Sequence, residues 1–411
     1  MASQPKVGGA AAEGIRVPFA EVDIRTSIRP TVAEIDLGAV QRNLARVRQA
    51  VGPGVRIFGV VKADAYGHGA VAVARALEPL CNALAVSLVE EGLELRAAGI
   101  RAPIVVLGAY YNRHQDEVLG ERLTPVVYDR ADLEKFAAAA ARRNRPAEVH
   151  LKIDTGMSRL GLPPGDLEAT LARLSALPAL RLSGLCTHFA SADLADAGTT
   201  EVALAQFQRG LDRAAQLGFH NLVNHAANSA AAVRFPAARL DAVRPGLALY
   251  GAMPSEIVSL VGLEGALALR TRVMAVRDVA VGAGVSYGGI WRAARPSRVA
   301  TLPIGYADGY PRHVSGAAVL LGGQRVPIVG AVCMDMLMID VTDLPASALD
   351  GPVTLIGRDG RQEITVDDLA RWAGTVSYEI LCGISKRVPR VLKDAAVTVS
   401  PGPTRPPTGG P

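Results

Sequence analysis

Through residues 57–243 the chain alternates between short apolar runs rich in β-branched residues and longer segments with helical spacing. One such segment, residues 199–217, places Leu204, Phe207 and Leu211 on one stripe, as an amphipathic helix requires. Eight strand signals separated by helices predict a (β/α)8 barrel, with a doubly wound open sheet as the alternative. The predicted strands are residues 57–61, 83–87, 104–107, 125–128, 149–153, 182–187, 222–224 and 242–243.

From about residue 266 the pattern changes to short apolar runs separated by Gly, Pro and Asp turns. This texture predicts a mainly antiparallel β domain. A short helix is expected at residues 365–373, with Thr365 as its N-cap and Asp367 and Asp368 in the first turn. The predicted strands are residues 267–276, 298–303, 317–321, 326–332, 336–341 and 353–356.

These patterns divide the chain into four parts. Residues 1–29 lack periodicity and are interpreted as a flexible tail, and residues 399–411 are a Pro/Gly/Thr stretch interpreted as disordered. The barrel is expected over residues 30–265 and the C-terminal β domain over residues 266–398.

Composition narrows the class of protein. The 411 residues are 49% hydrophobic and 4% aromatic, so a large core of Ala, Val and Leu can form. The net charge of +5 comes from interspersed charges, which argues against nucleic acid as a partner. The four cysteines form no close pair, so we expect no metal site, and no apolar run approaches a membrane span. A cytoplasmic protein that does not bind membranes is predicted.

The first predicted strand of the barrel is followed by Lys62, within the stretch Val-Val-Lys-Ala-Asp-Ala-Tyr-Gly-His-Gly of residues 60–69. The carboxyl ends of barrel strands open into the active-site mouth. A lysine there can form a Schiff base with a carbonyl compound, especially where its surroundings lower its pKa. The alternative is a lysine that only reaches out of the strand end to solvent.

The stretch at residues 60–69 resembles the lysine motif of alanine racemases, and the resemblance continues in the same order over roughly residues 30–395. It implies an enzyme dependent on pyridoxal 5′-phosphate (PLP) with a fold-type III architecture. It also implies a homodimer whose active sites are shared between subunits. The further matching segments are residues 152–161, 187–190, 228–229, 244–247, 286–288, 304–310, 333–335, 378–379 and 387–390.

The resemblance assigns the barrel residues to PLP. Lys62 would hold the cofactor, Arg159 would contact its phenolic oxygen and the substrate carboxylate, and His188 would pack near its ring. Lys152 would be carbamylated and orient Arg159. The loops after the last two barrel strands often bind phosphate, and Gly246 permits close backbone approach there. The cofactor-binding set is completed by Tyr66, Asn228, Ser229, Gly246, Leu247 and Tyr378.

Arg244 carries the most information about mechanism, because the resemblance places it against the pyridine nitrogen of PLP. An always-charged arginine donates a hydrogen bond and discourages protonation of that nitrogen. The carbanion is then less delocalised and less open to side reactions. Such tuning suits an enzyme that moves only one proton.

The second domain supplies the other catalytic group by the same resemblance. Racemisation needs acid/base groups on both faces of the α-carbon. Lys62 would serve the D-enantiomer, and Tyr287 of the partner subunit would serve the L-enantiomer. Substrate contacts would come from Tyr306, the main-chain N–H of Met334 and the neighbouring Asp335.

Four alternatives remain open. They are a single-domain PLP carrier, a fold-type III decarboxylase, a racemase acting on Ser, Lys or Arg, and a non-enzymatic binding module. The first would lack Tyr287, and the second is disfavoured by Tyr287, Arg244 and residues 333–335. Two departures from the family pattern are small: Ser158 stands where glycine is frequent, and Leu247 where isoleucine is frequent.

Overall fold

A computed structural model describes residues 28–108 and 114–393 of the chain, and all structural statements below concern those residues. The predicted tail at residues 1–29 lies outside them apart from its last two positions. The tail predicted at residues 399–411 lies wholly outside them.

The first domain is a ring of parallel strands, as predicted. Its strands follow the order β7-β6-β5-β4-β3-β2-β8. The prediction of a strand at residues 222–224 was wrong: the chain there makes only an isolated bridge, in which His225 pairs with Cys186 of β7 and Ala242 of β8. That single residue occupies the eighth position and closes the barrel. The strands are β2 (Arg56–Val60), β3 (Ala83–Val86), β4 (Ile104–Val106), β5 (Leu123–Val127), β6 (Ala147–Lys152), β7 (Leu180–Cys186) and β8 (Ala242–Val243).

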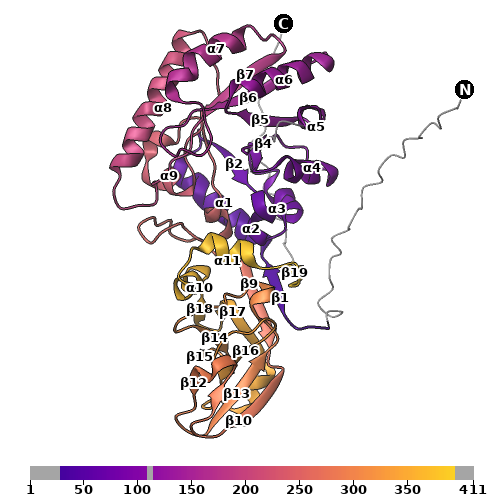
Figure 1. Cartoon of the computed structure of the whole chain (residues 1–411), viewed down its shortest axis with the longest axis vertical. Helices are drawn as coiled ribbons and strands as arrows, with labels where there is room; N and C mark the ends of the chain where they lie inside the picture. The colour runs from indigo at the N-terminus through magenta and orange to yellow at the C-terminus, as the bar shows by residue number, and fades with distance from the viewer. Residues whose placement is uncertain (1–27, 109–113, 394–411) are drawn as a thin grey trace, which may run out of the picture.

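Helices surround this ring (Figure 1). The first, α1, begins at Leu37 because Asp36 accepts a hydrogen bond from the Ala39 N–H at 2.7 Å, and it buries Val40, Leu44 and Val47. The helix expected at residues 199–217 is α8. The helices are α1 (Leu37–Val51), α2 (Lys62–Gly67), α3 (Ala70–Leu77), α4 (Val89–Ala97), α5 (Gln115–Gly120), α6 (Arg130–Arg142), α7 (Leu167–Ser175), α8 (Gly198–Gln216) and α9 (Ser229–Arg234).

The second domain is built on a mostly antiparallel sheet, as predicted, with the order β10-β13-β16-β15-β14-β17-β9-β1-β19. Its strand β1 (Val32–Ile35) precedes the barrel in sequence, pairing antiparallel with β9 and parallel with β19. Both ends of the described chain therefore lie in this sheet. The other strands are β9 (Leu267–Arg272), β10 (Ala275–Val279), β13 (Ser297–Leu302), β14 (Ala318–Leu321), β15 (Gln324–Val329), β16 (Leu337–Asp340), β17 (Pro352–Asp359), β18 (Gln362–Ile364) and β19 (Arg390–Leu392), with the separate pair β11 (Gly284–Val285) and β12 (Trp291–Arg292).

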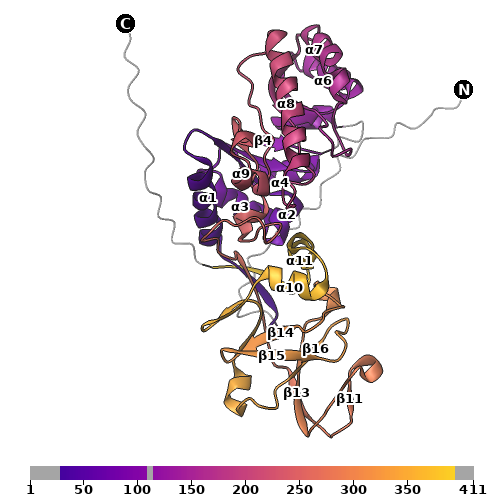
Figure 2. The same ribbon diagram turned by 90° about the vertical axis from the view of Figure 1, so that its left-hand side faces the viewer.

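Two helices of the second domain lie on its side nearest the barrel, with α10 packed against α11 (Figures 1 and 2). The predicted helix is α10 (Val366–Ala373), and Thr365 caps it by accepting the Asp368 N–H at 3.0 Å. The next helix, α11 (Ser377–Gly383), packs on α2, so it brings second-domain side chains to the end of strand β2.

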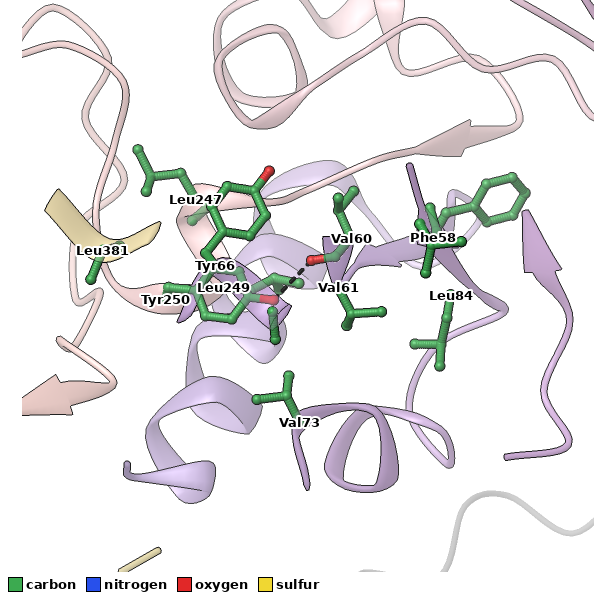
Figure 3. Packing of buried hydrophobic residues seen from close by; sticks show 14 of the residues in the cluster. Phe58, Val60, Val61, Tyr66, Val73, Leu84, Leu247, Leu249, Tyr250 and Leu381 are labelled. Atoms are coloured by element: carbon green, nitrogen blue, oxygen red, sulfur yellow. Dashed lines mark hydrogen bonds between the residues drawn. The ribbon is translucent and has the colours of Figure 1, made fainter. Parts of the chain in front are cut away.

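A buried aromatic cluster fills the space around this strand end (Figure 3). The Tyr250 hydroxyl donates to the Val60 carbonyl oxygen at 2.9 Å, and the ring of Tyr66 lies 4.9 Å from that of Tyr250. Leu381 of α11 lies beside them (Figure 3). Lys62, which follows Val61, is therefore attached to a closely packed part of the barrel.

Candidate active site

Lys62 begins a turn of unusual hand. The four residues after it, from Ala63 to Tyr66, all have φ between 52° and 54°, which is left-handed helical geometry. Non-glycine residues pay about 1–2 kcal/mol each for this conformation. Hydrogen bonds offset part of that cost: the Asp64 carboxylate accepts the Ala70 N–H at 2.6 Å, and the His68 Nδ1–H donates to the Ala65 and Tyr66 carbonyls at 3.0 and 2.9 Å. Lys62 is thus followed by a strained turn that several hydrogen bonds stabilise.

The surroundings of Lys62 favour its neutral amine. Burial lowers its pKa, and the positive charges of Arg159 and Arg244 lower it further, whereas Glu91 and Cys382 act in the opposite direction. A deprotonated lysine amine is a nucleophile for carbonyl compounds. These surroundings favour the Schiff-base role of Lys62, which stays a prediction.

Arg244 makes hydrogen bonds to several groups in the barrel interior. Its side chain is 5% exposed and donates to the carbonyl oxygens of Thr187, His225 and Ala226 at 2.7–2.9 Å. It also lies 2.6 Å from His225 Nδ1 and 3.2 Å from His188 Nδ1. Since arginine only donates, both Nδ1 atoms are the unprotonated acceptors of neutral imidazoles.

Two buried histidines behind Arg244 did not enter the sequence prediction. His225 lies next to His150, with 2.8 Å between His225 Nε2 and His150 Nδ1. Burial lowers the pKa of both, that of His150 to about 4. His225 directly follows the expected strand at 222–224, so its place at a strand end could have marked it. The pair forms a neutral chain that fixes the orientation of the Arg244 guanidinium.

The predicted phosphate-binding residues lie together. Asn228 caps α9 by accepting the Ala231 N–H at 3.0 Å, and the Ser229 hydroxyl accepts the Gly246 N–H at 3.0 Å. A Cβ on Gly246 would come within 2.4 Å of the Tyr66 hydroxyl, so only glycine fits there. The Tyr378 ring lies 5.8 Å from that of Tyr66. Leu247 is fully buried behind this group and contributes packing.

Lys152 ends β6, and the loop that follows carries Arg159. The Asp154 carboxylate accepts the N–H groups of residues 156–158 at 2.9–3.1 Å and so shapes the loop. Ser158 has a φ of 53°, which explains why glycine suits this position. Lys152 is only 8% exposed, and burial lowers its pKa.

The predicted residues of the second domain form a separate cluster. An open cavity of about 990 Å³ is lined by Tyr287, Met334 and Asp335. Tyr287 is 74% exposed and Met334 53% exposed. Asp335 pairs with Arg387 at 2.8 Å, so its carboxylate has an ion-pair partner.

Tyr306 is placed beside this cluster by a main-chain hydrogen bond. Its N–H donates to the Cys333 carbonyl at 3.1 Å, and a Cβ on Gly305 would collide with that carbonyl at 2.2 Å. Asp308 holds the same turn by accepting the Gly305 N–H at 3.1 Å and pairing with Arg29 at 2.7 Å. Tyr306 and Met334 are therefore fixed beside each other.

The two clusters do not meet within one chain. Lys62 starts α2 at the junction with the second domain, whereas Tyr287 lies between β11 and β12 at the opposite end of that domain (Figures 1 and 2). Each cluster thus holds only some of the predicted site residues. Residues 28–108 and 114–393 contain no group of three side chains that could hold a metal ion, and no helix there is long and apolar enough to cross a membrane.

The fold and the site define a two-domain barrel protein with a lysine of lowered pKa at the barrel mouth. Models of the alanine racemase N-terminal domain and C-terminal domain match residues 35–254 and 266–392, and the chain belongs to the alanine racemase family.

Individual relatives agree with this assignment. The chain is 44% identical over 379 residues to the alanine racemase of Sorangium cellulosum, covering 89% of this chain and all of the relative. The alanine racemase structure from D-cycloserine-producing Streptomyces lavendulae has a TM-score of 0.86 and 36% identity, covering 90% of this chain and 98% of that one. The structure from Bacillus anthracis with bound L-Ala-P has a TM-score of 0.82 and 37% identity, covering 90% and 96%.

Proposed function

We propose that this chain interconverts L-alanine and D-alanine with PLP bound at the barrel mouth. The observation that carries the proposal is Lys62: a lysine with a lowered pKa, held at the end of β2 in a chain that belongs to the alanine racemase family. Bound PLP would supply an electron-withdrawing ring that acidifies the α-C–H of the amino acid.

The residues around Lys62 fit this cofactor. The Ser229 hydroxyl, Gly246 and the Tyr66 hydroxyl form a small polar cradle that suits a phosphate, closed on one side by Tyr378. Asn228 shapes the start of α9 for the same group. Arg244 would face the pyridine nitrogen as a permanent donor, because His225 and three carbonyls already fix its orientation.

Two groups would move the proton. Lys62 would take or return it on the face of the D-enantiomer, and Tyr287 of a partner subunit on the face of the L-enantiomer. His188 would support that tyrosine: its Nδ1 is occupied by Arg244, so its Nε2–H is left to donate.

Arg159, Tyr306, Asp335 and the Met334 N–H would orient the amino acid. Arg159 provides a forked cation for the carboxylate. Burial lowers the pKa of the Lys152 amine, which favours its deprotonated form. That form would bond the carbon of CO₂ and release a proton, and the resulting carbamate anion would hold Arg159 in place.

The functional unit would be a homodimer with shared sites, located in the cytoplasm. The separation of Lys62 from Tyr287 within one chain supports the dimer. The four cysteines, all free thiols in the structure, fit a reducing compartment.

A racemisation assay over a panel of L-amino acids with added PLP tests the function. Alanine should be racemised fastest, with little turnover of serine, lysine or arginine. Equal rates on those amino acids would favour a broad-specificity racemase. Release of CO₂ without racemisation would point to a decarboxylase, and no turnover of any amino acid would contradict the proposal.

A further inference from the structure

One carboxylate joins the lysine turn to a neighbouring helix. Glu91, in the first turn of α4, accepts the Ala63 N–H through Oε1 at 2.6 Å. Its Oε2 accepts the N–H groups of Ser87 and Leu88 at 2.7 and 2.9 Å. Glu91 therefore caps two turns of opposite hand with its two oxygens.

The contact with Ala63 matters because of where the left-handed turn begins. The first N–H groups of any helical turn lack partners within the turn. Ala63 is the first left-handed residue and directly follows Lys62. The carboxylate satisfies that N–H, so it stabilises the strained turn at the point from which the lysine side chain leaves.

Glu91 also changes the electrostatics at the amine. The charged or titratable groups that act on Lys62 are Arg159 after β6, Arg244 at the end of β8, Cys382 of α11 and Glu91 of α4. After burial, the largest effect on the Lys62 pKa is the lowering by Arg159, followed by the raising by Glu91. Glu91 is thus the main acidic group that opposes the lowering of the Lys62 pKa by the two arginines.

Other acidic groups surround Glu91 itself. Burial raises the pKa of Asp64, with a smaller contribution in the same direction from Glu91. Burial also raises the pKa of Glu94, followed by the charges of Asp64 and Glu91. Among these carboxylates only Glu91 both acts on Lys62 and bonds the turn beside it.

We propose that Glu91 is a positioning residue for Lys62, holding the left-handed turn that follows the lysine and placing a negative charge against its cationic neighbours. The inference rests on the proposed function, in which Lys62 anchors PLP. In that setting Glu91 sets both the direction from which the amine reaches the cofactor and the pH range in which it is free to react.

The test measures the reactivity of Lys62 as a function of pH in the full-length chain. Brief acetic anhydride pulses, with and without PLP, are followed by mass spectrometry of the Lys62 peptide. The chain has six lysines, so the exposed Lys386 can serve as an internal standard. The variants are Glu91→Gln, Glu91→Asp and the matched control Glu90→Gln, which removes an exposed charge from the same helical turn.

Glu91→Gln should move the midpoint of Lys62 acetylation to lower pH by about one unit, since the charge that favours the ammonium form is gone. Glu91→Asp should keep the wild-type midpoint but weaken PLP binding roughly threefold or more, because the shorter side chain loses the bond to Ala63. Glu90→Gln should match the wild type in both measurements. A merely structural role would change stability without moving the midpoint.

Coinciding profiles for the wild type, Glu91→Gln and Glu90→Gln would overturn the inference, provided that PLP still protects Lys62. A Glu91→Asp chain with a shifted midpoint and normal PLP binding would also overturn it. Should Glu91→Gln fail to fold, the Glu91→Asp outcome decides. If PLP does not protect Lys62 in the wild type, the proposed function fails first, and this inference with it.

Discussion

The barrel mouth and the cavity of the second domain are built in opposite ways. Around Lys62, polar side chains are buried and tied: Arg244 alone donates to three carbonyls and contacts two imidazoles. Around Tyr287, the side chains are displayed at the surface, and apolar neighbours such as Ile290 and Met334 are exposed as well. The difference teaches that the barrel mouth is preorganised, whereas the second cluster presents an exposed surface that the proposed partner subunit would cover.

The largest effect on racemisation is expected from a substitution at the barrel mouth. Lys62→Arg keeps a cation but cannot bond a carbonyl carbon, so racemisation should fall by roughly a thousandfold or more. The visible absorbance of the PLP-loaded protein should disappear with it. Lys135→Arg, on the barrel surface, serves as the control and should keep both. Normal turnover in Lys62→Arg would remove the assignment.

The substitution Tyr287→Phe tests the exposed cluster of the second domain. Loss of the phenol should slow α-proton exchange from L-alanine by about 10²–10⁴-fold, because no second base reaches that face. Exchange from D-alanine should be affected less. Tyr310→Phe is the matched control, since that buried hydroxyl has no hydrogen-bond partner in the described structure. An equal and slight slowing in both directions would argue against two bases.

Acid should destabilise the folded chain through the buried histidines of the barrel. Burial lowers the pKa of the barrel histidines His68 and His150 to about 4, and that of His188 and His225 well below 6.5. In the unfolded chain these groups bind protons near pH 6.5, so folding stability is full above that pH and falls as the pH drops towards 4. The loss should be on the order of 1–2 kcal/mol per histidine between pH 7 and pH 5.

Urea unfolding at both pH values measures this loss. His150→Gln should reduce the pH dependence, whereas His313→Gln, at the surface of the second domain, should leave it unchanged. A stability that stays constant from pH 7 to pH 5 would mean that these imidazoles are not held neutral.

The sequence predicted most of the barrel mouth, because parallel strands deliver their carboxyl ends to one place. Strand periodicity places Lys62, His188 and Arg244 just after strands, and Arg159 in the longer loop after β6. Their roles in one site came from the resemblance to alanine racemases and stay predictions. The second domain was predicted from the change in apolar spacing, and the Thr365 cap from its local motif.

Other features depend on contacts that no local pattern encodes. An Ala-Asp-Ala-Tyr run carries no glycine to signal left-handed geometry, and contacts of His68, Glu91 and the packed aromatic cluster hold the turn. His225 closes the barrel as a single bridge instead of a strand, so periodicity predicted a strand that is not there. The distance between Lys62 and Tyr287 is likewise a property of domain arrangement.

Subunit complementation tests the central claim most directly. The Lys62→Ala and Tyr287→Phe chains, each nearly inactive alone, are co-expressed in equal amounts and their racemase activity is measured. If each site takes Lys62 from one subunit and Tyr287 from the other, mixed dimers hold one intact site, and about a quarter of wild-type activity should return. No recovery in verified mixed dimers, or full activity in a strictly monomeric wild type, would contradict the account.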